Sequence, residues 1–330
     1  MNVTGELEQE KAARLLLDTV VWAPSVHNTQ PWWFGTRGAT VTVHADLDRR
    51  LPVADPDGRE MLVSCGAALY TLRLAIRHLG HRPHVRVLTD PERPGLVADV
   101  TLGPPEPATG DVHRMYAQIR RRRTHRGGFR PEALPAGLLR ALRDHAYDEG
   151  ATLRIVADPR SRIALAALTE VAEQTHRCDP AYLTELAHWA PRPGSERPDG
   201  VHDDAYPRRP DHTDPYYAQR DFARGQGWGL IGDDQQDATG VVAVLTTGAD
   251  GRAEWLRAGQ ALQRVLLRAA ADDVSAAFHT QPLEIPELRE FIRVRHCEGA
   301  YPQMIMRLGI AESEISSVRR PASEVSRPEP

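Results

Sequence analysis

The sequence predicts a protein of mixed helices and strands, built from two related halves of one chain. Three observations lead to this prediction. Apolar stripes at helical spacing alternate with short segments of period two in both halves. The Pro- and Gly-rich stretch GPPEPATG, residues 103–110, separates the halves. CGAALYTLRL (65–74) resembles AGQALQRVLL (258–267), and each carries a small glycine that would allow close helix packing. These segments suggest a dimer made within one chain, although apolar helices also resemble one another by chance.

In the first half, residues 1–105, the apolar periodicity predicts a helix over residues 7–22, which Pro24 would end. Residues 40–45 alternate Val with Thr and His and predict a strand. A second helix would start near Asp57 and stop at Gly80, because glycine is favoured just after a helix C-terminus. Short strands at 85–88 and 96–102 would complete this half.

The second half, residues 106–315, would begin with a helix that leads into RRRTHRGGF, residues 121–129. The patterns then predict helices at 135–147, 161–174 and 255–271, and strands at 152–156, 241–247 and 303–308. Residues 191–236 are rich in Pro, Asp, His, Arg and Gly and predict a long lid inserted in this half. Residues 316–330 are rich in Pro, Ser and charges and predict a disordered tail.

Composition excludes several classes of protein. The chain has 330 residues, of which 41% are hydrophobic, so it can bury a sizeable core. A formal net charge of -4 argues against a general nucleic-acid binder. Three widely separated cysteines indicate neither a disulfide framework nor a metal site. The sequence shows neither a signal-peptide pattern nor an apolar run long enough to span a membrane, so we expect a cytoplasmic protein without a membrane partner.

The stretch APSVHNTQPWWF, residues 23–34, places small hydrogen-bonding side chains before two tryptophans and a phenylalanine. It is too polar for a core and too aromatic for a simple turn. Our interpretation is that the polar part faces a flat, heteroatom-rich ligand, while the aromatic part anchors the segment to the core.

The motif RRRTHR, residues 121–126, is the strongest electrostatic feature. Guanidinium groups suit phosphate oxygens, and Thr124 would add a neutral donor. The alternative is a solvated basic helix end.

Other motifs fail on their context. GWGLIG, residues 227–232, matches a dinucleotide-binding pattern but lacks the strand before it and the helix after it. Ser25 and His27 could suggest nucleophilic catalysis, but nothing supplies the orienting carboxylate. We identify no catalytic acid, base or nucleophile and no metal ligands from the sequence.

The combination of APSVHNTQPW, RRRTHRGGF and a late strand ending in RLG resembles the nitroreductase superfamily of flavoproteins. The likeness is closest to its Acg-type branch, in which two nitroreductase-like halves are fused in one chain, and it covers about residues 7–309. The resemblance implies an α+β fold, a nitroreductase-like mixed sheet with helices on both faces, whose two related halves form an intramolecular pseudo-dimer.

The resemblance also implies an FMN site at the interface of the halves. In that family an arginine-rich segment holds the ribityl phosphate, a Pro-Ser-x-x-Asn turn comes from the other half, a basic residue of the last strand approaches the phosphate, and a loop lies against the isoalloxazine. Carried over to this sequence, the FMN-binding residues are Arg122, Arg123, Thr124, Arg126, Ser25, Val26, His27, Asn28, Gln30, Arg307, His279, Thr280 and Gln281. Only one complete set of motifs is present, so we expect one FMN per chain.

The activity implied is electron transfer from NAD(P)H to an electron-poor small-molecule acceptor, such as a nitroaromatic or a quinone. The chemistry belongs to the flavin, and the protein would supply binding, orientation and access. The alternatives are an FMN-binding, flavin-sequestering protein with little or no turnover, and a catalytically inactive structural dimer. We expect a monomeric pseudo-dimer or a loose homo-oligomer, with no nucleic-acid partner.

Overall fold

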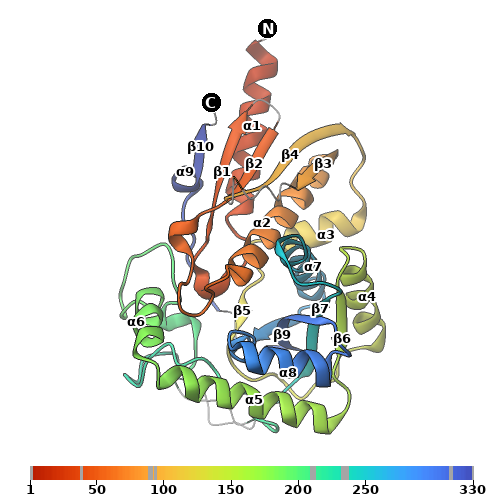
Figure 1. Ribbon diagram of the computed structural model, residues 1–330. Helices are drawn as coiled ribbons and strands as arrows, with labels where there is room; N and C mark the ends of the chain where they lie inside the picture. Colours follow the sequence, from red (N-terminus) through yellow and green to blue (C-terminus); the bar gives the residue numbers. More distant parts are fainter. Residues whose placement is uncertain are drawn as a thin grey trace.

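The computed structural model describes residues 3–37, 40–87, 92, 95–208, 213–231, 238–311 and 315–328 (Figure 1). Within these residues the strands form two five-stranded sheets, one for each predicted half, in the orders β10-β1-β2-β4-β3 and β5-β8-β9-β7-β6. Helices α2 and α7 lie side by side between the two sheets (Figure 1). The α+β class is confirmed. The strands are divided between two sheets because each half folds around its own hydrophobic core.

The elements of the first half follow the expected pattern, with one addition. They are α1 (Val3–Val20), β1 (Trp32–Arg37), β2 (Thr40–Ala45), α2 (Arg59–His78), β3 (His81–Val87) and β4 (Leu96–Pro105). Strand β1 was not expected from the sequence. Its residues Trp32 and Phe34 are fully buried against α1 and α2, so the aromatic part of APSVHNTQPWWF anchors the segment in the core, as predicted.

The second half contains the predicted elements and four more. It comprises α3 (Gly110–Gln118), β5 (Thr124–His125), α4 (Ala136–Tyr147), β6 (Thr152–Ile155), α5 (Pro159–Arg177), α6 (Pro180–Trp189), β7 (Val241–Thr247), α7 (Arg252–Ala270), β8 (Ser275–Phe278), α8 (Pro286–His296) and β9 (Tyr301–Gly309). The sequence pattern did not predict β5, α6, β8 or α8. In α8 Ile292 is the buried side chain, so its apolar stripe is weak.

The two halves share one topology. The first half runs strand–strand–helix–strand–strand along the chain, and the second half has the same order with α5 and α6 inserted after β6 and α8 inserted after β8. In both halves these four strands pair antiparallel in the spatial order first, second, fourth, third. A fifth strand joins each sheet in parallel, β10 beside β1 and β5 beside β8. The shared strand order supports the internal relationship that the helix repeat predicted.

Helices α2 and α7 cross where their glycines meet. A Cβ atom on Gly259 would lie 2.0 Å from the Val63 carbonyl oxygen, and one on Gly66 would lie 2.3 Å from the Leu256 carbonyl oxygen. No real Cβ fits at these distances, so both positions require glycine. The close helix approach predicted from the repeat is confirmed, and it holds the two halves together.

The lid expected at residues 191–236 is described at 191–208 and 213–231. We call residues 213–231 the strap. Tyr206 and, in the strap, Phe222 pack in a core cluster with Leu51, Tyr182 and Trp189. The strap residue Tyr217 is fully buried, and its hydroxyl donates to the Arg162 carbonyl oxygen at 2.9 Å. Most of residues 213–224 of the strap are therefore packed into the fold, whereas most of residues 225–231 are exposed.

The prediction of a disordered tail at 316–330 is wrong for the described residues 316–328. They contain α9 (Ala322–Val325) and β10 (Ser326–Pro328), which pairs in parallel with Phe34–Thr36 of β1. Val325 is fully buried in the first core, whereas residues 318–320 are only partly buried. Composition is a poor guide here because a pre-formed sheet edge supplies the partner.

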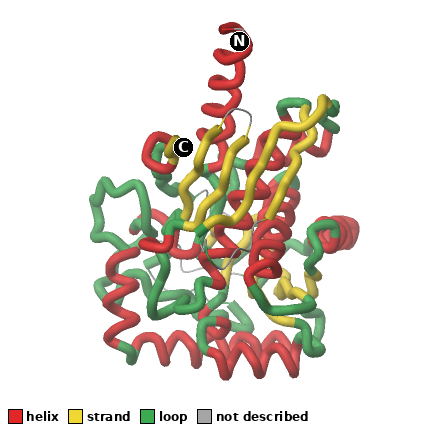
Figure 2. The backbone as a smooth tube through the Cα atoms, turned by 45° about the horizontal axis from the view of Figure 1, so that its top comes forward, coloured by secondary structure: helices red, strands yellow, loops and turns green. Residues whose placement is uncertain are grey.

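The overall arrangement places the first sheet in front of the helices, with the N-terminal helix extending beyond it (Figure 2). Among the described residues, no helix combines the length and the apolar character that a membrane crossing requires.

Candidate functional site

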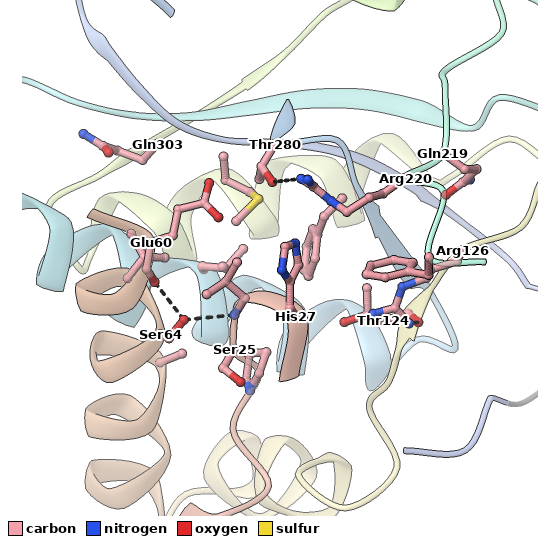
Figure 3. A pocket seen from close by; sticks show the side chains of 18 residues that line it. Ser25, His27, Glu60, Ser64, Thr124, Arg126, Gln219, Arg220, Thr280 and Gln303 are labelled. Atoms are coloured by element: carbon pink, nitrogen blue, oxygen red, sulfur yellow. Dashed lines mark hydrogen bonds between the residues drawn. The ribbon is translucent and has the colours of Figure 1, made fainter. Parts of the chain in front are cut away.

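A cavity lies at the junction of the two halves, beside the glycine crossing (Figure 3). Each structural unit around it contributes to the wall: the turn after α1, the first turns of α2, the arginine segment, the strap, α7, the loop after β8 and the start of β9. The described lining residues are Pro24, Ser25, Val26, His27, Glu60, Val63, Ser64, Ala67, Thr124, Arg126, Gln219, Arg220, Phe222, Leu262, Phe278, Thr280, Gln303 and Met304. We call this space the first cavity.

A second cavity adjoins the first, and both share Pro24, Ser25, Thr124 and Arg126. Its character is different, because basic and hydroxyl side chains dominate the wall. The described residues that line the second cavity but not the first are Asn28, Arg122, Arg123, Gly200, Val201, His202, Asp204, Ala205, Ile315, Ser316, Ser317, Val318 and Arg319. One continuous site therefore joins a largely apolar chamber to a basic one.

The turn that separates the chambers has an uncommon backbone. His27, Asn28 and Gln30 have φ values of 45°, 53° and 48°, in the left-handed region that few residues other than glycine adopt. The Ser25 hydroxyl accepts from the Gln30 backbone N–H at 2.9 Å, and the Ser64 hydroxyl accepts from the Val26 N–H at 3.1 Å. Such backbone persists only where surrounding contacts enforce it, and it is typical of binding sites.

The turn's side chains then fix its position against the rest of the chain. Asn28 Nδ2 donates to the carbonyl oxygens of Gly200 and Val318, at 3.0 and 3.2 Å, while its Oδ1 accepts from Arg319 at 3.1 Å. Gln30 Oε1 accepts from the Arg320 backbone N–H at 2.8 Å. The tail thus closes the second cavity.

Arginine side chains converge on the second cavity from two distant parts of the sequence. Arg122 is 5% exposed, and its Nε and Nη1 have no hydrogen-bond partner among the described residues. Burial first, and then repulsion by Arg123 and Arg126, lower the pKa of Arg122 to about 9. Burial and the same neighbours, together with Arg122, lower the pKa of Arg319 well below its usual value. An anion in the second cavity would stabilise Arg122, because its two buried nitrogen atoms have no described partner and a buried guanidinium group requires charge compensation.

The first cavity holds little free charge. Burial lowers the pKa of His27 far below its ordinary value, so the ring is neutral at pH 7, and neither ring nitrogen has a partner among the described residues. Arg220 is paired with Glu284 through both guanidinium nitrogens, one at 3.1 Å. Val63, Leu262 and Met304 supply apolar wall. The arrangement suits a flat apolar ring with polar edges.

Of the residues predicted to bind the ligand, most line these cavities: Ser25, Val26, His27, Asn28, Arg122, Arg123, Thr124, Arg126 and Thr280. The remaining four are not among the described lining residues. They are Gln30, His279, Gln281 and Arg307, and they are at most 1% exposed.

The expectation that Arg307 reaches a phosphate needs correction. Its Nε donates to His279 Nε2 at 2.8 Å, and its guanidinium lies over the rings of Phe129 and Tyr217. The His279 ring lies 3.3 Å from the Ala218 carbonyl oxygen, so it sits between Arg307 and the strap. Strand β9 directs this arginine into the core behind the site, where it fastens the strap.

Several residues in the cavity walls were not predicted from the sequence, and three of them are charged side chains that matter for the site. Arg319 lies in the tail that was expected to be disordered, Arg220 lies in the strap, and Glu60 looks like an ordinary acidic residue in a first helical turn. The RR pair at 319–320 was a visible basic signal in a polar tail, but no local pattern marks Glu60 or Arg220.

Comparison with known sequences identifies the family. Rv3131 of Mycobacterium tuberculosis H37Rv, which is named as an NAD(P)H nitroreductase, is 34% identical over 303 residues, covering 91% of this chain and 86% of Rv3131. Acg of the same strain, also named as an NAD(P)H nitroreductase, is 30% identical over 312 residues, covering 92% and 91%. The chain belongs to the nitroreductase family. The expected family is thereby confirmed.

No protein-family model matches this chain. Solved structures that resemble it include an Anabaena variabilis protein described as a nitroreductase (TM-score 0.49, 12% identity, 92% of this chain and 88% of that one). Another is the FMN-dependent nitroreductase NfnB from Mycobacterium smegmatis in complex with NADPH (TM-score 0.40, 16% identity, 66% and 100%). These structural overlaps are too small to identify a ligand.

The internal repeat of this nitroreductase does not reproduce the cavity wall. The helix alignment pairs Ala67, which lines the first cavity, with Gln260. Gln260 Oε1 accepts from Arg73 at 2.7 Å, and Arg73 is ion-paired with Glu149, which in turn binds Arg264. At the position of α7 that corresponds to Ala67, an ion-paired network therefore fills the space, whereas the small side chain of Ala67 leaves the first cavity open.

Proposed function

We propose that this nitroreductase binds one FMN across the two cavities and passes electrons from NAD(P)H to an electron-poor acceptor such as a nitroaromatic or a quinone. The observation that carries the proposal is the buried side chain of Arg122, whose Nε and Nη1 have no partner among the described residues, in a basic cavity that adjoins a largely apolar chamber. FMN combines a terminal phosphate with a flat ring, so it fits both chambers at once. The sequence relatives named as NAD(P)H nitroreductases support the electron donor.

The residues that line the two cavities are suited to FMN. Arg122, Arg123 and Arg319 would hold the phosphate in the second cavity, where Arg122 has two buried nitrogen atoms without a described partner. Thr124 and Ser25 lie where the cavities join and would meet the ribityl chain. When bound, the flavin supplies two-electron transfer between donor and acceptor, and the protein orients it and excludes water.

The four predicted residues behind the walls have a supporting role in this proposal. Gln30 holds the tail against the turn, and His279 with Arg307 holds the strap. Gln281 Nε2 donates to the Ala218 carbonyl oxygen at 3.1 Å and fastens the strap as well. Their replacement would disturb the shape of the site without removing a direct ligand contact.

A second candidate function, flavin sequestration with little turnover, is favoured by the strap. Gln219, Arg220 and Phe222 form part of the first cavity's wall, and the Arg220–Glu284 pair anchors them. Side chains of that pair are 7% and 1% exposed, so the anchor is shielded from water. A strap that stays anchored would exclude NAD(P)H and the acceptor.

The proposed site is assembled from one chain, which fits a monomeric pseudo-dimer and does not require a second copy. A loose homo-oligomer is compatible with it.

Three measurements on the purified chain test the proposal. After reconstitution with FMN we expect a yellow protein with one tightly bound FMN per chain. NADPH or NADH should bleach the flavin, and a nitroaromatic or quinone should restore its colour. Binding of FMN with negligible turnover would favour sequestration, and failure to bind FMN would refute both candidates. Two flavins per chain would refute the single-site assignment.

A further inference from the structure

The carboxyl group of Glu60 occupies an unusual place for an acid. It is the second residue of α2, is 5% exposed and lines the first cavity. Its side chain extends from the helix into the cavity on the side where Thr280 and Gln303 lie (Figure 3). One oxygen, Oε1, accepts from Arg59 Nη2 at 2.7 Å. Among the described residues that line the first cavity, Glu60 carries the only carboxyl group.

The buried charges around Glu60 do not balance. Three carboxyl groups, Asp55, Glu60 and Glu284, face two guanidinium groups, Arg59 and Arg220, that influence the titration of Glu60. Arg220 is committed to Glu284 by two hydrogen bonds, and Arg59 also donates to a backbone carbonyl. These interactions favour a neutral carboxyl group in the acidic set, because a surplus buried anion is costly.

Among these carboxyl groups, Glu60 is the most favoured to hold a proton. Burial first, and then repulsion by Glu284, raise the pKa of Glu60 to about 8, against the opposing effect of Arg59. Asp55 competes less well, because its two oxygens accept the backbone N–H groups of Glu60 and Met61 at 3.0 and 2.8 Å. Those bonds stabilise its ionised form. His176, 3.8 Å from Glu284, has its pKa lowered to about 4 and adds no positive charge at neutral pH.

We propose that Glu60 is the proton donor to the acceptor that is reduced in the first cavity. Reduction of a quinone to a hydroquinone takes up one hydride equivalent and one proton. In the proposed function NAD(P)H supplies the hydride equivalent by way of the flavin. The Glu60 O–H bond breaks as an O–H bond forms on the acceptor oxygen, and the carboxylate left behind stays paired with Arg59. Solvent returns the proton before the next cycle.

Other polar groups of the cavity are weaker candidates for this step. The depressed pKa of His27 leaves its ring unprotonated at pH 7, so it has no acidic proton of suitable strength. Burial lowers the pKa of Arg126 only to about 10. A donor with a pKa near the working pH transfers protons best. Glu60 meets that condition and faces the cavity.

The inference rests on the proposed function, so its test includes a measurement that needs neither flavin nor turnover. Infrared spectra of the flavin-free protein between pH 6 and 10 should show a protonated carboxyl band that disappears with a midpoint near 8. The band should be missing in Glu60→Gln. Glu185→Gln is the matched control, because Glu185 is another partly buried carboxyl with a raised pKa that does not line the cavity. The control should retain the band.

The second measurement is reoxidation of the pre-reduced, FMN-loaded protein by a quinone in stopped flow. In the wild type the rate should fall as pH rises through about 8, because the acid form is consumed. Glu60→Gln should be slower by about 10²-fold or more and lose this pH dependence. Glu185→Gln should behave as the wild type. Circular dichroism and FMN affinity of each variant separate a chemical effect from misfolding.

Each outcome has a defined meaning. A carboxyl band that persists in Glu60→Gln, or a wild-type rate that is constant from pH 6 to 10, would overturn the proton-donor role. The pH profile of the wild-type reoxidation rate tests the proton-donor role even if the Glu60→Gln variant does not fold. If the protein binds no FMN, the proposed function and the donor role both fail, while the infrared titration still reports whether Glu60 is neutral.

Discussion

Replacement of Arg122 by Met should have opposite effects on ligand binding and on the stability of the flavin-free protein. The side chain is 5% exposed, and its Nε and Nη1 have no partner among the described residues, so both are available to a phosphate. A hydrogen bond to a charged group contributes about 1.5–3 kcal/mol. Loss of two such bonds should weaken FMN binding by about 10²- to 10⁴-fold, since about 1.4 kcal/mol corresponds to a factor of ten.

In the flavin-free protein the same change removes a buried charge that burial, Arg123 and Arg126 already disfavour. Methionine keeps the length of the apolar stem, so the packing is retained. We therefore expect the melting temperature of the flavin-free variant to rise above that of the wild type. If Arg122 only stabilised the fold, its replacement would lower the melting temperature of the flavin-free protein.

Arg120→Met is the matched control, because Arg120 is exposed and lies over the Trp22 ring outside both cavities. Its effect on FMN affinity should be less than about threefold, because solvent screens an exposed charge. Fluorescence titration of FMN and thermal unfolding of the flavin-free proteins measure both quantities. Equal FMN affinities for the two variants, or a less stable flavin-free Arg122→Met, would refute the assignment of the arginine cluster to the phosphate.

Three further predictions test the fold and the site. Gly259→Ala should destabilise the protein by about 3 kcal/mol or more in urea unfolding, because its Cβ would lie 2.0 Å from a backbone oxygen. Gly137→Ala is the control: its Cβ would meet nothing within 4 Å, so it should stabilise the protein by about 0.5–1 kcal/mol. Similar losses of stability for both variants would contradict the helix crossing. Burial lowers the pKa of His125 to about 4, so the stability that its neutral ring contributes is complete above pH 6.5 and is lost as the pH falls toward 4. His125→Gln should therefore reduce the acid-induced loss of stability by about 3 kcal/mol. An unchanged pH dependence of stability would show that the ring is not buried in the neutral form. Deletion of residues 316–330 should lower both stability and FMN affinity, because it removes Arg319 and the β10 pairing with β1; a fully stable truncated protein that binds FMN normally would restore the interpretation of a disordered tail.

Local sequence patterns determined much of the fold and part of the candidate site. The long helices and the alternating strands were predictable because their side chains repeat with the period of the element that buries them. The glycines of α2 and α7 predicted a close helix crossing. In the structure, a Cβ atom added to either glycine would lie 2.0–2.3 Å from a backbone oxygen of the other helix. The polar turn at Ser25–Asn28 and the arginines at 122–126 were recognisable because each motif is contiguous in the chain.

The tertiary structure decided which side chains share a cavity. Arg307 matched a family position, yet β9 directs it into the core, while Arg319 reaches the second cavity from a tail whose composition predicted disorder. That tail is ordered because β1 offers it an edge, and a sequence pattern cannot show the availability of an edge. The protonation of Glu60 depends on Glu284, which lies far away in the sequence. Charge interactions act through space, so the acidity of a side chain is known only once its neighbours are in place.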